Sequence, residues 1–325
     1  MSSIKCIGQF TIDDIVLPDG TVRMGTMGGN ALYSAAGANL WQERGTVGAV
    51  ARVGEDYPPL FLEQLQQRGF DTGALKRIPR SHLRAWLLYE SNGERRSLCR
   101  NEEVLSYPPI SVASFQEYFE AYQKLHLENS PLLSDLEPAA RLADAYHLAP
   151  QTFRRHRDNL REIRRGNPGA VVSLDPSPFY MSRGSEAEFR EILSQVDILL
   201  PSREELFSWF GEEVPHREAA ASLAAMGPSV VVLKLGKEGS YVYRRETGGG
   251  ELYPICPIQT VDVTGAGDSY CGGFLAGWLQ TGDPAYAAAC GAVSASFAVA
   301  GWGPEKLLQA GPALACKLRD QLLGR

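Results

Sequence analysis

Short apolar runs that alternate with helical segments restrict the fold of this chain more than any other feature. Three such runs, at residues 171–174, 196–200 and 230–234, are separated by segments with helical spacing. Strands that alternate with helices form a mostly parallel sheet with helices on both faces. We therefore predict an α/β fold, with a further strand at residues 240–243 and a loop at residues 247–250.

The chain has the composition of an ordinary globular protein, with 325 residues of which 44% are hydrophobic and 22% are charged. We find neither an internal repeat nor a linker long enough to divide it. We expect residues 1–325 to form a single domain.

A predicted hairpin interrupts the alternation. Strands at residues 83–89 and 96–100 flank residues 91–94, in which Asn92-Gly93 is a typical hairpin turn. With the extended segment that follows the first strand, this hairpin would form a small separate sheet. We expect the segments at about 11–27 and 82–103 to act as a lid that excludes water from a reaction.

A glycine-rich turn, Gly265-Ala266-Gly267-Asp268, lies between an expected strand at residues 257–261 and an apolar helix. Its small residues let a ligand approach the backbone, and helix N-termini attract phosphate. Such turns are common, so the adjacent carboxylate of Asp268 is the more specific signal. It can accept a proton from a hydroxyl group that attacks the phosphate. The turn matches neither the P-loop nor the dinucleotide-binding motif.

Two polar positions near the amino terminus are further candidates for ligand binding. Asp13 follows the first predicted strand, where open α/β sheets bind ligands, although an acid there can also simply cap a turn. The sequence Gly28-Gly29-Asn30 opens an alanine-rich helix and would present another helix N-terminus to a polar ligand.

Charge and composition argue against several classes of partner. The formal charge of −6 argues against a nucleic-acid partner, and the basic run at residues 154–165 fits a solvated helix face. No apolar run reaches the ~18 residues of a membrane span, and we find no signal-peptide core. The six cysteines are scattered without a Cys-x-x-Cys pair, so we expect reduced thiols in a cytoplasmic protein.

Residues 261–273 resemble the C-terminal signature of the ribokinase-like (PfkB-type) carbohydrate kinases. Weaker matches follow in the family's order at residues 8–13, 28–30, 51–56, 175–176 and 235–239. The resemblance implies a ribokinase-like fold and transfer of the γ-phosphoryl group of ATP, with Mg²⁺, to a hydroxyl group, usually a hydroxymethyl, of a small sugar. Because lids of this type often pair between subunits, it also implies a homodimer.

The resemblance implies roles for individual residues. Asp268 would be the general base, and Gly265, Ala266 and Gly267 would form the anion hole with it. The substrate would be bound by Asp13, Gly29, Asn30 and Arg100. The nucleotide would be bound by Lys234, Gly236, Gly239 and Thr264. Glu205 would organise Mg²⁺ through water, and Asp262 would contribute to a potassium site.

Four positions depart from the family pattern. Ser202 replaces the Asn of an Asn-x-x-Glu motif, and Lys234 stands where a Thr often touches the nucleotide. Cys271 replaces a small polar residue that follows the catalytic turn, and Tyr33 lies where some members keep Asn. These departures leave the substrate open.

We predict a sugar kinase, and two alternatives stay open. The first is a nucleoside kinase of the same fold, in which Tyr33, Trp86 or Phe10 would stack on a base. The second is a catalytically weak sensor of nucleotide or sugar, which the residues at Ser202 and Lys234 suggest.

Overall fold

The computed structural model describes residues 3–17, 19–89, 95–96, 128–182 and 184–325. The strands of its larger sheet are β1 Ile4–Ile7, β4 Val47–Val53, β5 Leu75–Arg77, β8 Ala145–Leu148, β9 Val171–Leu174, β10 Ile198–Leu199, β11 Val230–Lys234, β12 Ser240–Arg244 and β13 Gly249–Tyr253. Their order across the sheet is β13-β12-β11-β10-β9-β8-β1-β4-β5. Neighbouring strands are parallel except that β12 is antiparallel to both β11 and β13, which confirms the mostly parallel sheet.

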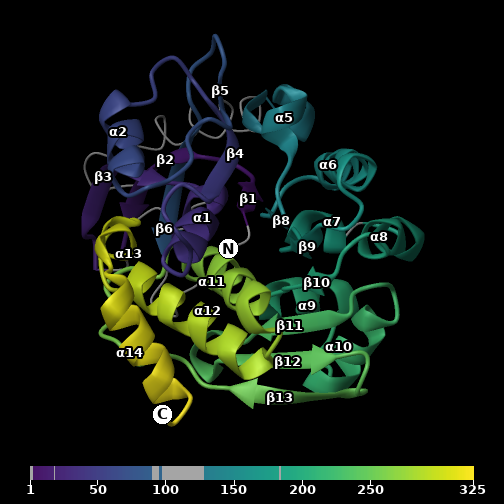
Figure 1. Ribbon diagram of the computed structural model, residues 1–325. Coiled ribbons are helices and arrows are strands. Elements are labelled where there is room, and N and C mark those ends of the chain that lie inside the picture. The colour runs from purple at the N-terminus through teal and green to yellow at the C-terminus, as the bar shows by residue number, and fades with distance from the viewer. Residues whose placement is uncertain (1–2, 18, 90–94, 97–127, 183) are drawn as a thin grey trace.

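Helices cover both faces of this sheet, as predicted (Figure 1). The longer ones are α1 Asn30–Asn39, α2 Pro59–Gln67, α6 Phe153–Gly166, α8 Glu186–Leu193, α9 Arg203–Phe210, α10 His216–Ala224, α11 Ala266–Thr281, α12 Pro284–Val299 and α14 Pro312–Leu322. Val230 and Val232 of β11 share one core with α1, α11 and α12, whereas Val231 and Leu233 share another with α6, α8 and α10. Side chains alternate between the faces of a strand, so β11 supplies both cores.

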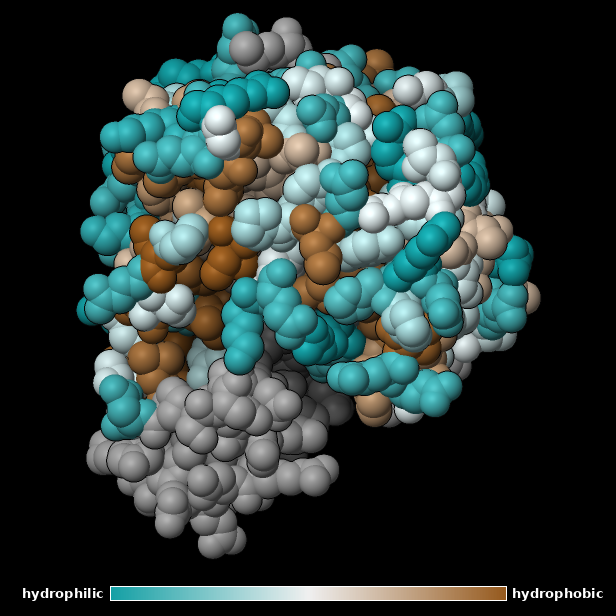
Figure 2. Space-filling model, turned by 90° about the horizontal axis from the view of Figure 1, so that it is seen from below, coloured by the Kyte–Doolittle hydropathy of each residue, from teal (hydrophilic) through white to brown (hydrophobic). Residues whose placement is uncertain are grey.

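Shorter helical segments complete the described residues: α5 Pro138–Arg141, α7 Pro178–Met181, α13 Glu305–Gln309 and the 3₁₀ turns Leu133–Asp135 and Gly236–Glu238. Across these described parts of the chain, we find no helix with the length and apolar character needed to cross a membrane. Exposed apolar side chains do occur in β13, at Leu252, and after it, at Ile255, Ile258, Val261 and Val263. Figure 2, which views the molecule from below, shows apolar side chains gathered along the left of this face.

Close helix packing places the start of α11 against α1. A Cβ on Gly272 would lie 1.8 Å from the carbonyl oxygen of Ser34 in α1. A Cβ on Gly273 would lie 2.4 Å from Oγ of Ser294 in α12. The glycine pair therefore lets α11 fit between two neighbouring helices at backbone distance.

A second sheet stands apart from the first. Its strands β2 Thr11–Val16, β3 Val22–Gly28, β6 Arg84–Tyr89 and β7 Arg95–Arg96 have the order β3-β2-β6-β7. The predicted small sheet is thus confirmed, and β6 and β7 are antiparallel, as a hairpin requires. The predicted turn at residues 91–94 and the remainder of the second lid segment, residues 97–103, lie outside the described residues.

Two predicted elements are wrong. Residues 257–261 form no strand, because the N–H groups of Val261 and Asp262 donate to the carbonyl oxygen of Val299, at 2.8 and 3.3 Å, rather than to the sheet. The predicted loop at residues 247–250 ends early, since Gly249 and Gly250 begin β13. Gly250 leaves room for a neighbour instead of making a loop: a Cβ there would lie 2.7 Å from the Tyr241 ring.

Candidate active site

The glycine-rich turn forms the N-terminus of α11, as predicted. Gly265 caps the helix in the left-handed conformation, with φ 73°, and Asp268 lies half-buried in the first helical turn. The ring of Tyr33 covers Gly265 so closely that a Cβ would lie 2.2 Å from Cδ1 of the ring. Both the conformation and the space therefore require glycine. The N–H of Ala266 donates to the carbonyl oxygen of Val263 at 3.3 Å, and this N-terminal end of α11 is the end at which a helix attracts anions.

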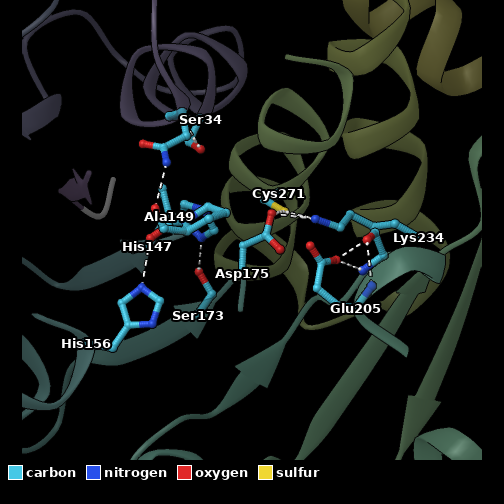
Figure 3. Close-up of polar contacts among 12 residues, drawn as sticks. Ser34, His147, Ala149, His156, Ser173, Asp175, Glu205, Lys234 and Cys271 are labelled. Atoms are coloured by element: carbon cyan, nitrogen blue, oxygen red, sulfur yellow. Dashed lines mark hydrogen bonds and ion pairs between the residues drawn. The ribbon is translucent and has the colours of Figure 1, made fainter. Parts of the chain in front are cut away.

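The ammonium group of Lys234 lies beside this turn. Its Nζ is 3.6 Å from the point that a Cβ on Gly267 would occupy. Lys234 ends β11, and its ammonium forms an ion pair with the carboxylate of Asp175, which follows β9. Figure 3 shows the side chains of Asp175, Lys234, Cys271 and Glu205 pointing toward one another. A helix N-terminus and a cation thus meet at one point, which favours a phosphate group.

The charges in this cluster shift the pKa values of its members. Burial raises the pKa of Asp175 to about 7, although the ammonium of Lys234 opposes the rise. Burial alone would lower the pKa of Lys234, but the negative charge of Asp175 outweighs it and raises that pKa. Lys234 therefore stays protonated. Burial also raises the pKa of Cys271, so its thiol stays neutral and donates to Oδ2 of Asp175 at 3.4 Å.

Ser202 and Glu205 form a capping box at the start of α9. The backbone N–H of Ser202 donates to Oε2 of Glu205 at 2.6 Å, and the Ser202 hydroxyl binds the same oxygen. The pattern Ser-x-x-Glu before a helix is a known capping signal, which we overlooked in the sequence. Serine at this position therefore caps α9 and holds the buried carboxylate of Glu205.

The residues near this carboxylate fit a magnesium ion that arrives with a nucleotide. Among the described residues, no group of three or more His, Cys, Asp or Glu side chains could hold a metal ion. Asp175 does keep one buried oxygen, Oδ1, to which none of the described residues forms a hydrogen bond. Magnesium usually retains several waters and takes few protein ligands when phosphates bind it, so Glu205 and Asp175 could hold it through water.

Asp262 and Thr264 join the glycine-rich turn to the small sheet. Oδ1 of Asp262 accepts hydrogen bonds from the N–H and hydroxyl groups of Thr264, at 2.9 and 2.7 Å. The Thr264 hydroxyl also lies 2.5 Å from the hydroxyl of Tyr89 at the end of β6. Oδ2 of Asp262 is buried and has no hydrogen-bond partner among the described residues. An unpaired anionic oxygen of this kind fits the expected potassium ion.

Asp13 lies on β2, where its side chain is 2% exposed and its Oδ1 accepts a hydrogen bond from the Thr11 hydroxyl at 2.5 Å. A Cβ on Gly28 would lie 1.8 Å from Oδ2 of Asp13, so this glycine makes room for the carboxylate. Asn30 differs from the expectation, because backbone groups occupy both ends of its amide. Its Oδ1 accepts from the N–H of Gln9, and its Nδ2 donates to the carbonyl oxygen of Pro150, both at 2.8 Å.

Tyr33 connects the two halves of the site. It is 1% exposed, and its hydroxyl has no hydrogen-bond partner within the part of the chain that the structure describes. Burial raises its pKa, and the charges of Asp13, Asp262 and Asp268 raise it further. Tyr33 therefore stays a neutral phenol, and the sequence indicated it both as a departure from the family pattern and as a ring that could stack on a base.

The remaining predicted residues are placed as follows. Gly236 and Gly239 form the turn between β11 and β12, where the N–H of Leu235 donates to the carbonyl oxygen of Gly239 at 2.9 Å. Both glycines have positive φ values, 61° and 92°. Arg100 lies outside the described residues. Phe10 is 1% exposed and packs near Tyr57, with ring centroids 6.1 Å apart.

Comparison with known proteins identifies the family. The model of the pfkB family carbohydrate kinases matches residues 1–309. The chain belongs to this family. A cytidine kinase of Thermococcus kodakarensis is 26% identical over 282 residues, which cover 86% of this chain and 90% of that one. An uncharacterised sugar kinase of Archaeoglobus fulgidus is 32% identical over 240 residues, or 72% of this chain and 83% of that one.

Solved structures share the fold of this pfkB-family kinase. A candidate Ribokinase II of E. coli, in complex with ATP and Mg²⁺, has a TM-score of 0.74 at 17% identity and covers 99% of this chain and 100% of its own. A nucleoside kinase of Burkholderia thailandensis, in complex with inosine, has a TM-score of 0.73 at 16% identity, and the match covers 99% of each chain. The predicted ribokinase-like fold is thus confirmed.

Proposed function

We propose that this kinase transfers the γ-phosphoryl group of ATP to a hydroxyl group, preferably a hydroxymethyl, of a small sugar. One observation carries the proposal: Asp268 lies in the first turn of α11, at a helix N-terminus that also has the Lys234 ammonium beside it. A base and an anion site in contact are what phosphoryl transfer to an alcohol needs.

In the proposed reaction, the carboxylate of Asp268 takes the proton of the acceptor hydroxyl. The acceptor oxygen then forms a bond to the γ-phosphorus, and the bond from that phosphorus to the bridging oxygen of ADP breaks. The N–H groups at Gly265, Ala266 and Gly267 would stabilise the negative charge on the phosphoryl oxygens. These groups are fixed before the reaction, which lowers the cost of reorganising them.

Glu205 and Asp175 would hold Mg²⁺ through water, and Asp262 would contribute to a potassium site. Bound to the nucleotide phosphates, Mg²⁺ would neutralise part of their charge. The complex of the E. coli structure with ATP and Mg²⁺ supports this cofactor. Removal of divalent metal with a chelator should abolish turnover, and restored Mg²⁺ should recover it.

The nucleotide would bind along the turn after β11, near Lys234, Gly236, Gly239 and Thr264. The exposed apolar side chains of the segment after β13, which leads to the glycine-rich turn at Gly265, would suit a nucleotide base. The N–H and hydroxyl groups of Thr264 already bind Asp262, and the hydroxyl also contacts Tyr89, so we propose that Thr264 serves the nucleotide site by holding the turn before α11 in place.

The acceptor would bind on the other side of Tyr33, through Asp13, the turn at Gly29 and Asn30, and Arg100. The amide of Asn30 holds two backbone segments, so we propose that Asn30 shapes this turn and that Asp13 binds the acceptor hydroxyls. The small sheet would act as the lid of one domain spanning residues 1–325. Pairing of two lids would form a homodimer, which light scattering after size-exclusion chromatography tests.

A nucleoside acceptor is the second candidate, because the cytidine kinase and the nucleoside kinase named above resemble this chain along most of its length. A coupled assay for ADP release with Mg-ATP across sugars and nucleosides decides between them. We expect turnover with a sugar, and turnover with nucleosides alone would favour the second candidate. Equal, low ATP turnover by wild type and Asp268→Asn with every acceptor would instead indicate a sensor.

A further inference from the structure

The structure pairs two of the departures from the family pattern. Ser202 and Lys234 face each other in a parallel β-bridge, and the N–H of Lys234 donates to the carbonyl oxygen of Pro201 at 2.8 Å. The residue that caps α9 and the residue that carries the ammonium are therefore held by one backbone contact. The positions of these two side chains therefore depend on the same backbone contact.

The ammonium of Lys234 is held in a fixed place. Its side chain is 11% exposed, and that of its partner Asp175 is 4% exposed. Its Nζ also lies 3.6 Å from Sγ of Cys271, so α11 contacts it as well as the sheet. A buried lysine in contact on several sides has lost the freedom that a surface lysine keeps.

The ammonium of Lys234 faces the start of α11, where the transferring phosphoryl group would bind. Apart from the chain neighbours of Gly267 and the nearby backbone of α11, only Lys234 among the described residues has an atom within 4 Å of the point where a Cβ on Gly267 would stand. Gly267 itself is exposed at the end of the helix. A phosphoryl oxygen bound to the first N–H groups of α11 would therefore come within reach of Nζ.

The carboxylate of Glu205, which Ser202 binds on the other side of this bridge, already has part of its hydrogen-bonding capacity filled. Both the N–H and the hydroxyl of Ser202 bind Oε2 of Glu205, which leaves Oε1 for the water shell of a metal ion. The protein thus offers the metal only contacts through water, from Glu205 and Asp175, and it offers the phosphate the ammonium of Lys234 as well.

We propose that Lys234 is a further catalytic residue, which binds the transferring phosphoryl group directly, and that Asp175 is the residue that positions its ammonium. This inference rests on the proposed kinase function. In this arrangement, the fixed charge of Lys234 replaces part of the neutralisation that metal ions provide, and Ser202 is tolerated opposite it for that reason.

The first test measures binding without turnover or metal. Calorimetry with inorganic tripolyphosphate in the presence of a chelator should show binding to the wild type. We expect Lys234→Met to weaken it by about 10- to 100-fold, the range for a hydrogen bond to a charged group. Lys234→Arg should keep most of the affinity. Lys317→Met, on the exposed face of α14, is the matched control and should bind as the wild type does.

Lys234→Met leaves the buried carboxylate of Asp175 without its partner, which can unfold the protein. The double variant Lys234→Met/Asp175→Asn removes that unpaired charge, and circular dichroism verifies its fold. We expect the folded double variant to bind tripolyphosphate as weakly as Lys234→Met. Wild-type affinity in the folded double variant would overturn the proposal.

The second test examines the pairing with Ser202. Lys234→Thr should raise the Mg²⁺ concentration needed for half-maximal ADP release. Adding Ser202→Asn to Lys234→Thr should recover part of the loss, so that the two changes are not additive. Strict additivity would contradict the compensation. The two proposals fail separately: tripolyphosphate binding through Lys234 without any kinase turnover refutes the function, and turnover with binding that ignores Lys234 refutes this inference.

Discussion

The ring of Tyr33 lies directly over the backbone of Gly265. A Cβ on Gly265 would come within 2.2 to 2.5 Å of three ring carbons, and the glycine also has a positive φ of 73°. Tyr33 belongs to α1 and Gly265 caps α11, so the contact joins the helix that follows the Gly29 turn to the anion turn. The ring of Tyr33 thus links the helix that follows the proposed acceptor turn to the proposed phosphate-binding turn.

Gly265→Ala should destabilise the protein and abolish most of its turnover. The matched control is Gly282→Ala at the other end of α11, where φ is 65° and no atom lies within 4 Å of the new Cβ. The control pays only the backbone strain, about 1 kcal/mol, whereas Gly265→Ala also displaces Tyr33. Urea unfolding and an ADP-release assay measure both effects. Equal losses of stability in the two variants would show that the ring contact contributes nothing.

Asp268→Asn should lower kcat by about 10²- to 10⁴-fold, which is the usual contribution of a general base. The KM for ATP should stay close to the wild-type value, because the amide keeps the size of the carboxylate. Glu186→Gln, in the first turn of α8, makes the same chemical change far from the site and should leave kcat unaltered. Steady-state kinetics with the best acceptor measures these values. A kcat above one tenth of wild type would remove Asp268 from the role of base.

Buried histidines should make the protein less stable as the pH falls from 7 to 5. Burial lowers the pKa of His147 to about 3 and the pKa values of His82 and His156 to about 4. Each histidine stays neutral in the fold but gains a proton on unfolding, so stability is present above the ordinary pKa of about 6.5 and is lost below it. The loss is on the order of 1 to 2 kcal/mol per histidine at pH 5.

Asp175 acts in the opposite sense, since burial raises its pKa to about 7, but it is one group against three. Thermal unfolding between pH 7 and pH 5 measures the net slope. His147→Asn keeps a group able to bind Ser173, whose hydroxyl lies 2.9 Å from Nδ1 of His147, and should make the slope shallower. A melting temperature that rises on acidification would refute the assignment of neutral histidines.

The hydrogen bond between Tyr89 and Thr264 should couple the small sheet to the turn before α11. Tyr89→Phe and Thr264→Val each remove it, and the double variant closes a thermodynamic cycle. We expect a coupling energy of about 0.5 to 1.5 kcal/mol in urea unfolding, the net value of one hydrogen bond. A coupling energy of zero would mean that the 2.5 Å contact does not stabilise the fold.

Part of the site was predictable because its signals are local. The turn Gly265-Ala266-Gly267-Asp268 and the strand that ends at Lys234 are each readable from a few neighbouring residues, whereas Asp13, expected after a strand, lies within β2. Other parts were misread where a distant residue decides the outcome. Residues 257–261 read as a strand, yet their backbone bonds to Val299. Nothing near Asn30 in the sequence indicates that its amide binds Gln9 and Pro150, and its contact with a substrate stays a prediction.

By itself, the sequence determined the α/β alternation and the kinase family, because strand and helix periodicity and a contiguous signature depend on neighbours along the chain. Only the tertiary structure decided that Lys234 forms an ion pair with Asp175, that it faces Gly267, and that Tyr33 closes over Gly265. The reason is the strand order. The ends of β9 and β11 lie on either side of β10, so side chains at or just after these ends meet although they lie 59 positions apart in the chain. The burial of these side chains and the charges that surround them depend on this arrangement of the strands.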